Sequence, residues 1–198
     1  MQLQHIKAVV FDLDGTLVDS RLNFHAMCDD IGWPRGTAIL EQLAQVSDAA
    51  EIARIEQIIR RHEMAGAHTA SWMPGAEQCL QVLMQAGIPL ALLTRNMRAA
   101  TELTRQRLQI PIARVLTRED CAAKPSPEGL HIVASEFGIA AKQLLYVGDY
   151  IFDLQTAANA GAVSCLYLND GNQHFAAQAD WVFSHFDELA AAFKHRVV

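Results

Sequence analysis

The sequence lacks the cysteine and histidine spacings that bind zinc or build a disulfide framework. Its 4 cysteines are scattered without a CxxC pair, and its 8 histidines contain no HxxxH or HExxH pair. Scattered cysteines are typical of reduced thiols, so we expect a cytoplasmic protein. A zinc site and a disulfide-stapled fold are not expected.

Long apolar runs and clusters of positive charge are also absent. No run approaches the roughly 20 residues of a membrane-spanning helix, and the short apolar run near the N-terminus stops at Asp12, unlike a secretory signal peptide. The net charge is -6, and no basic block marks a surface for nucleic acid or anionic lipid. We therefore expect neither a nucleic-acid nor a membrane partner.

What is present fits an ordinary globular protein. The chain has 198 residues, of which 51% are hydrophobic and 19% are charged. This length is enough for one sizeable domain or for a domain with a small insertion, and the composition argues against intrinsic disorder. It leaves open whether the protein is a monomer or a homodimer.

Apolar segments alternate with helical patterns over most of the chain. Strands are expected at 8–11, 90–93, 112–116, 144–147, 163–168 and 181–183. Helices are expected at about 74–87, 97–108, 127–138, 153–160 and 186–194. This alternation predicts an α/β fold, a three-layer, Rossmann-like parallel sheet with helices on both faces.

One stretch breaks the alternation. Residues 19–71 carry helical spacing only, and Ser47 or Asp48 can cap a helix that follows them. We read this stretch as an all-helical insertion. The predicted division is therefore a core of residues 1–18 and 72–198 and an inserted helical domain of residues 19–71.

Two carboxylates follow the first expected strand. Asp12 and Asp14 come directly after the apolar run 8–11, and Gly15 follows them. Side chains two positions apart on a strand share a face, and glycine lets the chain turn sharply there. Two close carboxylates repel, so they call for a cation or a shared proton. An EF-hand does not fit, because this glycine falls at loop position four and Asn23 occupies the place of the bidentate glutamate.

Other polar residues follow later strands. Thr94 and Asp149 each come just after an expected strand, and Lys124 lies in the loop beyond 112–116. Ligands of parallel sheets bind at the carboxyl ends of the strands, so these side chains should converge. Asp149 and Asp153 would bring the carboxylates to four, a cluster that favours Mg²⁺ because its donors are oxygens. The turn at 169–172 is expected at the surface.

Four segments together resemble the motifs of the haloacid dehalogenase (HAD) superfamily of phosphohydrolases, subfamily I, in order and spacing. They are Asp12-Leu13-Asp14-Gly15-Thr16-Leu17-Val18, Leu92-Leu93-Thr94-Arg95-Asn96, Lys124-Pro125-Ser126-Pro127-Glu128 and Gly148-Asp149-Tyr150-Ile151-Phe152-Asp153. The resemblance covers residues 5–168. Residues 14–20 also resemble the phosphoglycolate phosphatase-like group.

The resemblance implies catalytic roles for four of these residues. Asp12 would be the nucleophile that forms an aspartyl-phosphate, and Asp14 the general acid and base. Thr94 and Lys124 would hold the phosphoryl group. Each residue type also has an ordinary structural role, such as a turn aspartate or an exposed loop lysine.

The resemblance also implies a Mg²⁺ site. Its ligands would be the Asp12 carboxylate, the Asp14 backbone carbonyl and Asp149, while Asp153 would orient a water on the metal or Lys124. Asp153 could instead, or in addition, act as the N-cap of the next helix.

Two neighbours of Thr94 stay open. Asn96 is a candidate for phosphate or substrate binding, or a helix cap. Arg95 either reaches the substrate or pairs on the surface.

In the family, a helical insertion at this position is a mobile cap that selects the leaving group. Residues 19–71 resemble such a cap but are somewhat short. Its candidate substrate contacts are cationic, although most should lie on solvated helix faces: Arg21, His25, Arg35, Arg54, Arg60, Arg61, His62 and His68. Met27 and Trp33 are expected to pack.

The first hypothesis is thus a Mg²⁺-dependent phosphatase acting on a small phosphorylated metabolite, phosphoglycolate-like or a sugar phosphate. A phosphomutase of the β-phosphoglucomutase kind shares the motifs, although the short insertion argues against it. A non-catalytic binding protein on the same fold is the third reading, because fold alone does not prove activity.

Overall fold

The computed structural model describes residues 3–194, so the outermost residues of the predicted core, 1–2 and 195–198, lie outside the described residues. Its centre is a six-stranded parallel sheet with the strand order β5-β4-β1-β6-β7-β8. The strands are β1 (Ala8–Phe11), β4 (Leu90–Leu93), β5 (Arg114–Leu116), β6 (Leu144–Gly148), β7 (Val163–Tyr167) and β8 (Trp181–Phe183). The predicted α/β fold is confirmed.

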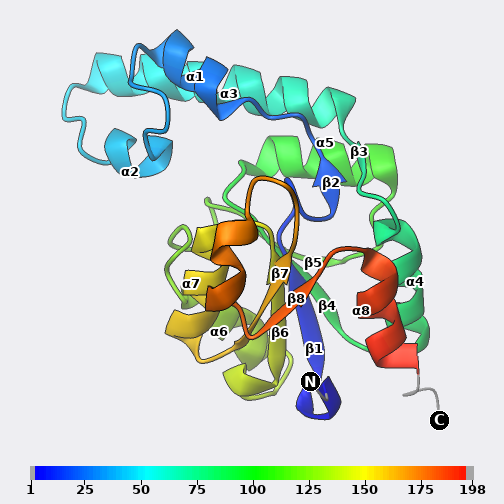
Figure 1. Ribbon diagram of the computed structural model, residues 1–198. Coiled ribbons are helices and arrows are strands. Elements are labelled where there is room, and N and C mark those ends of the chain that lie inside the picture. Colours follow the sequence, from blue (N-terminus) through cyan, green and yellow to red (C-terminus); the bar gives the residue numbers. More distant parts are fainter. Residues whose placement is uncertain (1–2, 195–198) are drawn as a thin grey trace.

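Helices cover both faces of the sheet (Figure 1). One face carries α4 (Ala76–Gln85) and α8 (Phe186–Phe193), and the other α6 (Glu128–Glu136) and α7 (Ile151–Ala160). The central strand β1 shows why its sequence is continuously apolar. Val9 and Phe11 pack with α4 and α8, whereas Ala8 and Val10 pack with α6 and α7. A strand buried on both faces has no polar alternation.

Some predicted boundaries shift. The expected strand at 112–116 pairs only from Arg114 onward, because Ile112 packs into the core without joining the ladder. The helix expected from Asp153 begins at Ile151, so Asp153 is its third residue and not its N-cap. The remaining elements of the core are α5 (Arg98–Leu108) and the short 3₁₀ helices η1 (Leu3–His5), η2 (Ala141–Gln143) and η3 (Gln173–Gln178).

The expected insertion is not helical throughout. Its ends form a two-stranded antiparallel ribbon of β2 (Val18–Asp19) and β3 (Ser71–Trp72). Between them lie α1 (Phe24–Ile31), α2 (Ile39–Leu43) and α3 (Ala49–Thr69), which we call the helical insertion (residues 20–70). The prediction of an all-helical stretch was therefore wrong at both ends. Strands of two residues are too short to leave an alternating pattern in the sequence.

The helical insertion has an apolar cluster of its own. Met27 and Trp33 pack there with Ile55 and Ile59, as expected. Asp48 caps α3 by accepting a hydrogen bond from the Glu51 N–H at 2.9 Å. The cap and the buried apolar side of α3 together stabilise this 21-residue helix.

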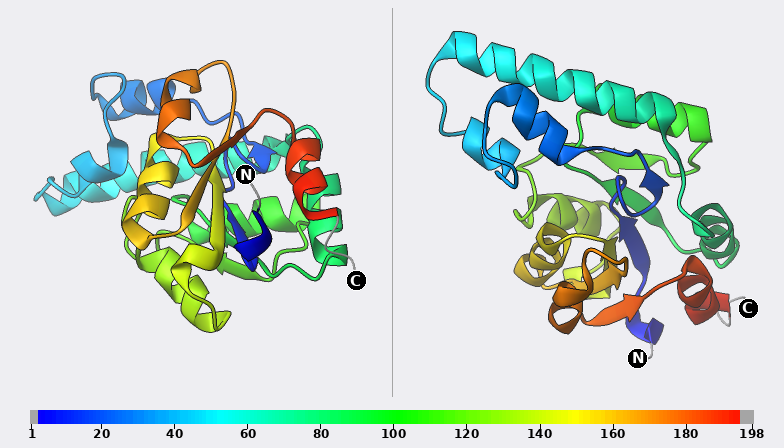
Figure 2. Two further views of the ribbon diagram at one scale, coloured as in Figure 1. Left: turned by 60° about the horizontal axis from the view of Figure 1, so that its bottom comes forward. Right: turned by 45° about the horizontal axis from the view of Figure 1, so that its top comes forward.

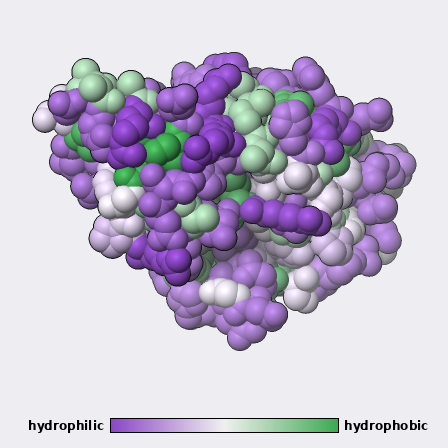
Figure 3. All heavy atoms as spheres, turned by 90° about the horizontal axis from the view of Figure 1, so that it is seen from above, coloured by the Kyte–Doolittle hydropathy of each residue, from purple (hydrophilic) through white to green (hydrophobic). Residues whose placement is uncertain are grey.

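The helical insertion lies over the edge of the sheet at which β1 ends (Figures 1 and 2). The C-terminal half of α3 packs beside α5, where Ala67 meets Met97 and Ala100. Seen from this side, the molecule presents a mostly hydrophilic surface with smaller hydrophobic areas (Figure 3). Among the described residues, no helix combines the length and the apolar character that crossing a bilayer requires.

Candidate active site

The end of β1 is the centre of the site. Asp12 follows the strand directly, its N–H donates to the Val147 carbonyl at 2.8 Å, and only 6% of the residue is exposed. The buried Lys124 ammonium donates to Asp12 Oδ1 at 2.6 Å and to Asp153 Oδ1 at 2.5 Å. The structure thus brings Asp12 together with two predicted site residues that lie more than a hundred positions further along the chain.

Asp149 completes a cluster of three carboxylates. One oxygen each from Asp12, Asp149 and Asp153 lie within 4.8 Å of one another. Thr16 donates its hydroxyl to Asp149 Oδ1 at 3.1 Å. Gly15 has φ +89°, and a Cβ at this position would stand 2.6 Å from Asp149 Oδ2. The glycine after the two aspartates is therefore required for both its backbone conformation and the approach of Asp149.

Burial and neighbouring charges shift the pKa values of Asp12, Asp149 and Lys124. Burial raises the pKa of Asp12 well above its usual range, Asp153 and Asp149 add to this, and Lys124 opposes it. Burial, with repulsion from Asp153, raises the pKa of Asp149 to about 7. Burial alone would lower the pKa of Lys124, but Asp12 and Asp153 hold it above its usual value. Lys124 is therefore a permanent cation, shared by two acids.

This set of donors fits a hard divalent cation. Three carboxylates face one ammonium group, and all of the donor atoms are oxygens. Oxygen ligands suit Mg²⁺ and Ca²⁺ better than the softer transition metals. A bound dication would offset the burial and the repulsion that raise the pKa values of Asp12 and Asp149.

Asp153 is held by groups that the sequence analysis did not identify. The Tyr146 hydroxyl lies 3.0 Å from Asp153 Oδ1, and the Tyr150 N–H donates to Oδ2 at 3.0 Å. Gly148 is needed beside it, because a Cβ there would collide with the Asp153 side chain. Both oxygens of Asp153 are thus engaged, which orients it towards Lys124.

Asp14 lies two residues after Asp12 and has a different environment. Asn96 donates from Nδ2 to Asp14 Oδ2 at 2.9 Å, whereas Oδ1 is buried without a hydrogen-bond partner among the described residues. Burial raises the pKa of Asp14, and hydrogen bonding from Ser20 and Asn96 only partly offsets it. A carboxyl group in this state keeps a proton to higher pH than usual.

The segment after β4 supplies Asn96 and Thr94. Thr94 ends the strand's buried run, and its Oγ1 accepts a hydrogen bond from the Asn96 N–H at 3.1 Å. Asn96 is not the N-cap of α5, since that position is held by Met97. The reading of Asn96 as only a helix cap was therefore wrong; its amide is directed at Asp14.

Arg95 points away from Asp14 and towards the helical insertion. Its guanidinium donates to the Lys124 carbonyl at 3.0 Å and to Glu41 of α2 at 2.8 Å, and lies 4.4 Å from the centre of the Phe152 ring. The sequence left open whether Arg95 reaches the substrate or forms an ion pair. These contacts show an ion pair with Glu41 of the helical insertion.

The predicted cationic residues of the insertion mostly pair with neighbouring acids. Arg35 pairs with Asp29, Arg54 with Glu51, and Arg61 and His62 share Asp30. His25 and His68 are exposed. These contacts agree with the expectation that most of them lie on solvated faces.

One residue of the site lies in a segment expected to be a surface turn. Asn172 is only 4% exposed, and its Nδ2 lies 2.7 Å from the Asp149 carbonyl and 2.9 Å from the Tyr167 carbonyl. The turn is present, but its last residue is buried behind Asp149. An asparagine in a turn carries no sequence signal for such a distant partner.

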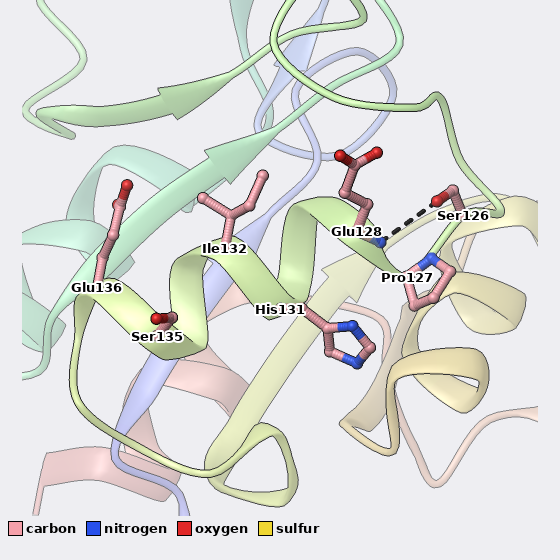
Figure 4. Close-up of a pocket in the computed structure, with 7 residues that line it drawn as sticks. All are labelled: Ser126, Pro127, Glu128, His131, Ile132, Ser135 and Glu136. Atoms are coloured by element: carbon pink, nitrogen blue, oxygen red, sulfur yellow. Dashed lines mark hydrogen bonds between the residues drawn. The ribbon is translucent and has the colours of Figure 1, made fainter.

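The residues of the third motif, 124–128, lie partly in the site and partly at the surface. Lys124 points inward, whereas its successors line an open groove of about 570 Å³ along α6 (Figure 4). The groove is formed by Ser126, Pro127, Glu128, His131, Ile132, Ser135 and Glu136. None of these is among the residues predicted for the site, and Glu128 serves locally by accepting from the Ala122 N–H at 2.7 Å.

Comparison with known proteins identifies similar chains. Residues 6–161 match the family model of the haloacid dehalogenase-like hydrolases. An uncharacterized hydrolase of Saccharomyces cerevisiae is 32% identical over 87% of this chain and 82% of its own. A phosphoglycolate phosphatase of Aliivibrio fischeri is 31% identical over 95% of this chain and 96% of its own. A solved structure of a predicted phosphoglycolate phosphatase from Haemophilus somnus superposes with a TM-score of 0.75 at 21% identity, covering 95% and 98% of the two chains.

Proposed function

Because the chain belongs to the haloacid dehalogenase-like hydrolase family, we propose that it is a Mg²⁺-dependent phosphatase that cleaves a small phosphate ester through an aspartyl-phosphate on Asp12. The observation that carries the proposal is the buried Asp12 carboxylate at the end of β1, which contacts Lys124 and lies beside Asp149 and Asp153. The resemblance noted from the four motifs is confirmed at the level of the family.

In the proposed first step, Asp12 attacks the phosphorus, and the bond to the leaving oxygen breaks. Lys124 neutralises charge on the phosphoryl oxygens, and Thr94 and Asn96 orient them. Asp14 gives its proton to the leaving oxygen. The raised pKa of Asp14 supports this role, because the group must be protonated at the start of the step.

In the second step, Asp14, now ionised, accepts a proton from water, which attacks the phosphorus of the aspartyl-phosphate. Inorganic phosphate leaves, and Asp12 is restored as a carboxylate. The metal, held by Asp12, the Asp14 carbonyl and Asp149, would supply charge neutralisation for the phosphoryl group. Asp153 holds Lys124 in place during both steps, as their 2.5 Å contact suggests.

We further propose that residues 19–71 act as the cap that selects the leaving group. The proposed substrate is a small phosphorylated metabolite, and phosphoglycolate is the first candidate because a relative of 31% identity carries that name. Four free cysteines, three of them buried, support action in the reducing cytoplasm.

The test is hydrolysis of p-nitrophenyl phosphate with Mg²⁺, with EDTA and by the Asp12→Asn variant. Activity should be lost in EDTA and in the variant, which keeps the shape of the side chain but removes the nucleophile. Asp187→Asn, at an exposed position of α8 that is not part of the site, is the matched control and should retain activity. Hydrolysis by Asp12→Asn at the wild-type rate would refute the mechanism. With a sugar phosphate, an isomerised sugar phosphate in place of inorganic phosphate would identify a mutase.

A further inference from the structure

The segment of residues 94–97 has two faces that contact different parts of the molecule. Asn96 faces the carboxylate site, where its Nδ2 donates to Asp14, and its N–H donates to the Thr94 hydroxyl. Arg95 and Met97 face the helical insertion, where Arg95 pairs with Glu41 and Met97 packs against α3. The segment that offers groups to a phosphate is therefore also a contact surface for the insertion.

Glu63 is a buried residue of the insertion that is joined to this segment. It lies on α3, is 7% exposed, and accepts hydrogen bonds from Arg118 Nη1 at 2.6 Å and Nη2 at 2.9 Å. Its Oε2 also accepts from the Met97 N–H at 3.3 Å. Arg118 in turn donates from Nη1 to the Arg95 carbonyl at 2.8 Å. The pair thus binds the backbone on both sides of Asn96.

Helix packing alone does not require this buried ion pair. Ala67, Met97 and Ala100 already give α3 and α5 a close apolar contact. Burying a carboxylate and a guanidinium carries a desolvation cost that an apolar pair would avoid. Burial raises the pKa of Glu63, hydrogen bonding from Arg118 lowers it, and the Asp14 carboxyl is close enough to raise it further. The pair is therefore placed beside the site and directed at its backbone.

We propose that Glu63 is a positioning residue for phosphate binding: through Arg118 and the Met97 N–H, it fixes residues 95–97 so that Thr94 and Asn96 can hold the phosphoryl group. This inference rests on the proposed phosphatase function. It makes phosphate affinity depend on the insertion lying against α5.

The geometry predicts a selective effect, since the carboxylate cluster has other supports. The Asp12 N–H is hydrogen-bonded to β6, and Asp149 accepts hydrogen bonds from Thr16 and Asn172. None of these contacts passes through Glu63. Loss of the Glu63 contacts should therefore weaken phosphate binding while leaving Mg²⁺ binding unchanged.

The test compares Glu63→Ala, Glu63→Gln and Arg118→Met with the wild type. Glu102→Gln is the matched control, because Glu102 forms an ion pair with Arg105 on the same helix α5 at 2.7 Å, away from residues 94–97. For each protein we would measure kcat and KM for p-nitrophenyl phosphate, the affinity for inorganic phosphate, and the Mg²⁺ affinity without substrate. Calorimetry gives both affinities without turnover, and all measurements are made well below each Tm.

Glu63→Ala should lower kcat/KM at least about tenfold and weaken phosphate binding by a similar factor, with Mg²⁺ affinity within about twofold of the wild type. The kcat/KM and phosphate affinity of Glu63→Gln should lie between those of Glu63→Ala and the wild type, because its amide oxygen still accepts from the Met97 N–H. If Glu63→Ala does not fold, Glu63→Gln and Arg118→Met decide the question.

Two results would overturn the inference. One is a lower Tm with phosphate affinity and kcat/KM matching the Glu102→Gln control, which would make Glu63 merely structural. The other is a parallel loss of phosphate and Mg²⁺ binding. A wild type that binds phosphate but hydrolyses nothing would contradict the proposed function instead, and the phosphate affinities would still test Glu63.

Discussion

Lowering the pH from about 8 to about 6 should weaken Mg²⁺ binding to the substrate-free enzyme at least about tenfold. The perturbation acts on Asp149, whose pKa is raised to about 7 by burial and by Asp153. A group with this pKa is roughly 90% ionised at the higher pH and roughly 10% ionised at the lower, and Mg²⁺ binds only the ionised form. The raised pKa of Asp12 can only increase the effect.

The same shift sets the sign of the effect on stability. A carboxyl group whose pKa is higher in the folded than in the unfolded protein stabilises the fold at low pH. That contribution is lost as the pH rises through about 7, the pKa of folded Asp149. The metal-free protein should therefore lose stability as the pH rises towards about 7. Over the same rise in pH, the stabilisation by added Mg²⁺ should grow.

The assay is calorimetric titration with Mg²⁺ at both pH values, in two buffers of different ionisation enthalpy. Protons should be released on binding, and more of them at the lower pH. Asp149→Asn should bind Mg²⁺ weakly at either pH, whereas Asp187→Asn should behave as the wild type. Equal dissociation constants at the two pH values, with no proton release, would refute the assignment of Asp149 as a titrating ligand.

Two further changes test the backbone and the core. Gly15→Ala should reduce Mg²⁺ affinity and activity at least about tenfold, since φ is +89° and the new Cβ would meet Asp149 at 2.6 Å; an unchanged Mg²⁺ titration would contradict the close approach. Phe186→Ala should destabilise the fold by about 3–5 kcal/mol, because Phe186, the first residue of α8, is fully buried against the sheet. Urea unfolding measures this loss, and a change below about 1 kcal/mol would show that the site repacks.

The parts that sequence reasoning predicted correctly share one physical basis. β1 and β6 are apolar runs because both of their faces are buried, so they could be located directly. Parallel strands then end at one edge, which predicted that Asp12 and Asp149 lie together, and carboxylate oxygens of both belong to one cluster. Thr94 follows β4, the strand that pairs with β1. Lys124 was expected nearby from its motif, and it contacts Asp12.

The parts that were missed depend on contacts between distant segments. Asn172 is read from sequence as a turn residue, and only the fold places its amide behind Asp149. Glu63 and Arg118 look like ordinary charged residues of a helix and a loop, and their pairing arises only when α3 lies on α5. The β2–β3 ribbon has two residues in each strand, fewer than a period-two pattern needs to be recognised.

The ribbon has a consequence for how the molecule could be re-engineered. Val18 pairs with Trp72 and Asp19 with Ser71, so the chain leaves the core and returns to it at adjacent points. The cost of closing a loop between fixed, neighbouring ends rises only slowly with loop length. A helical unit of another size or origin could therefore be spliced between these two junctions without changing the register of β1 against β4. If the insertion selects the leaving group as proposed, exchanging it at these two junctions would transfer the substrate preference together with it.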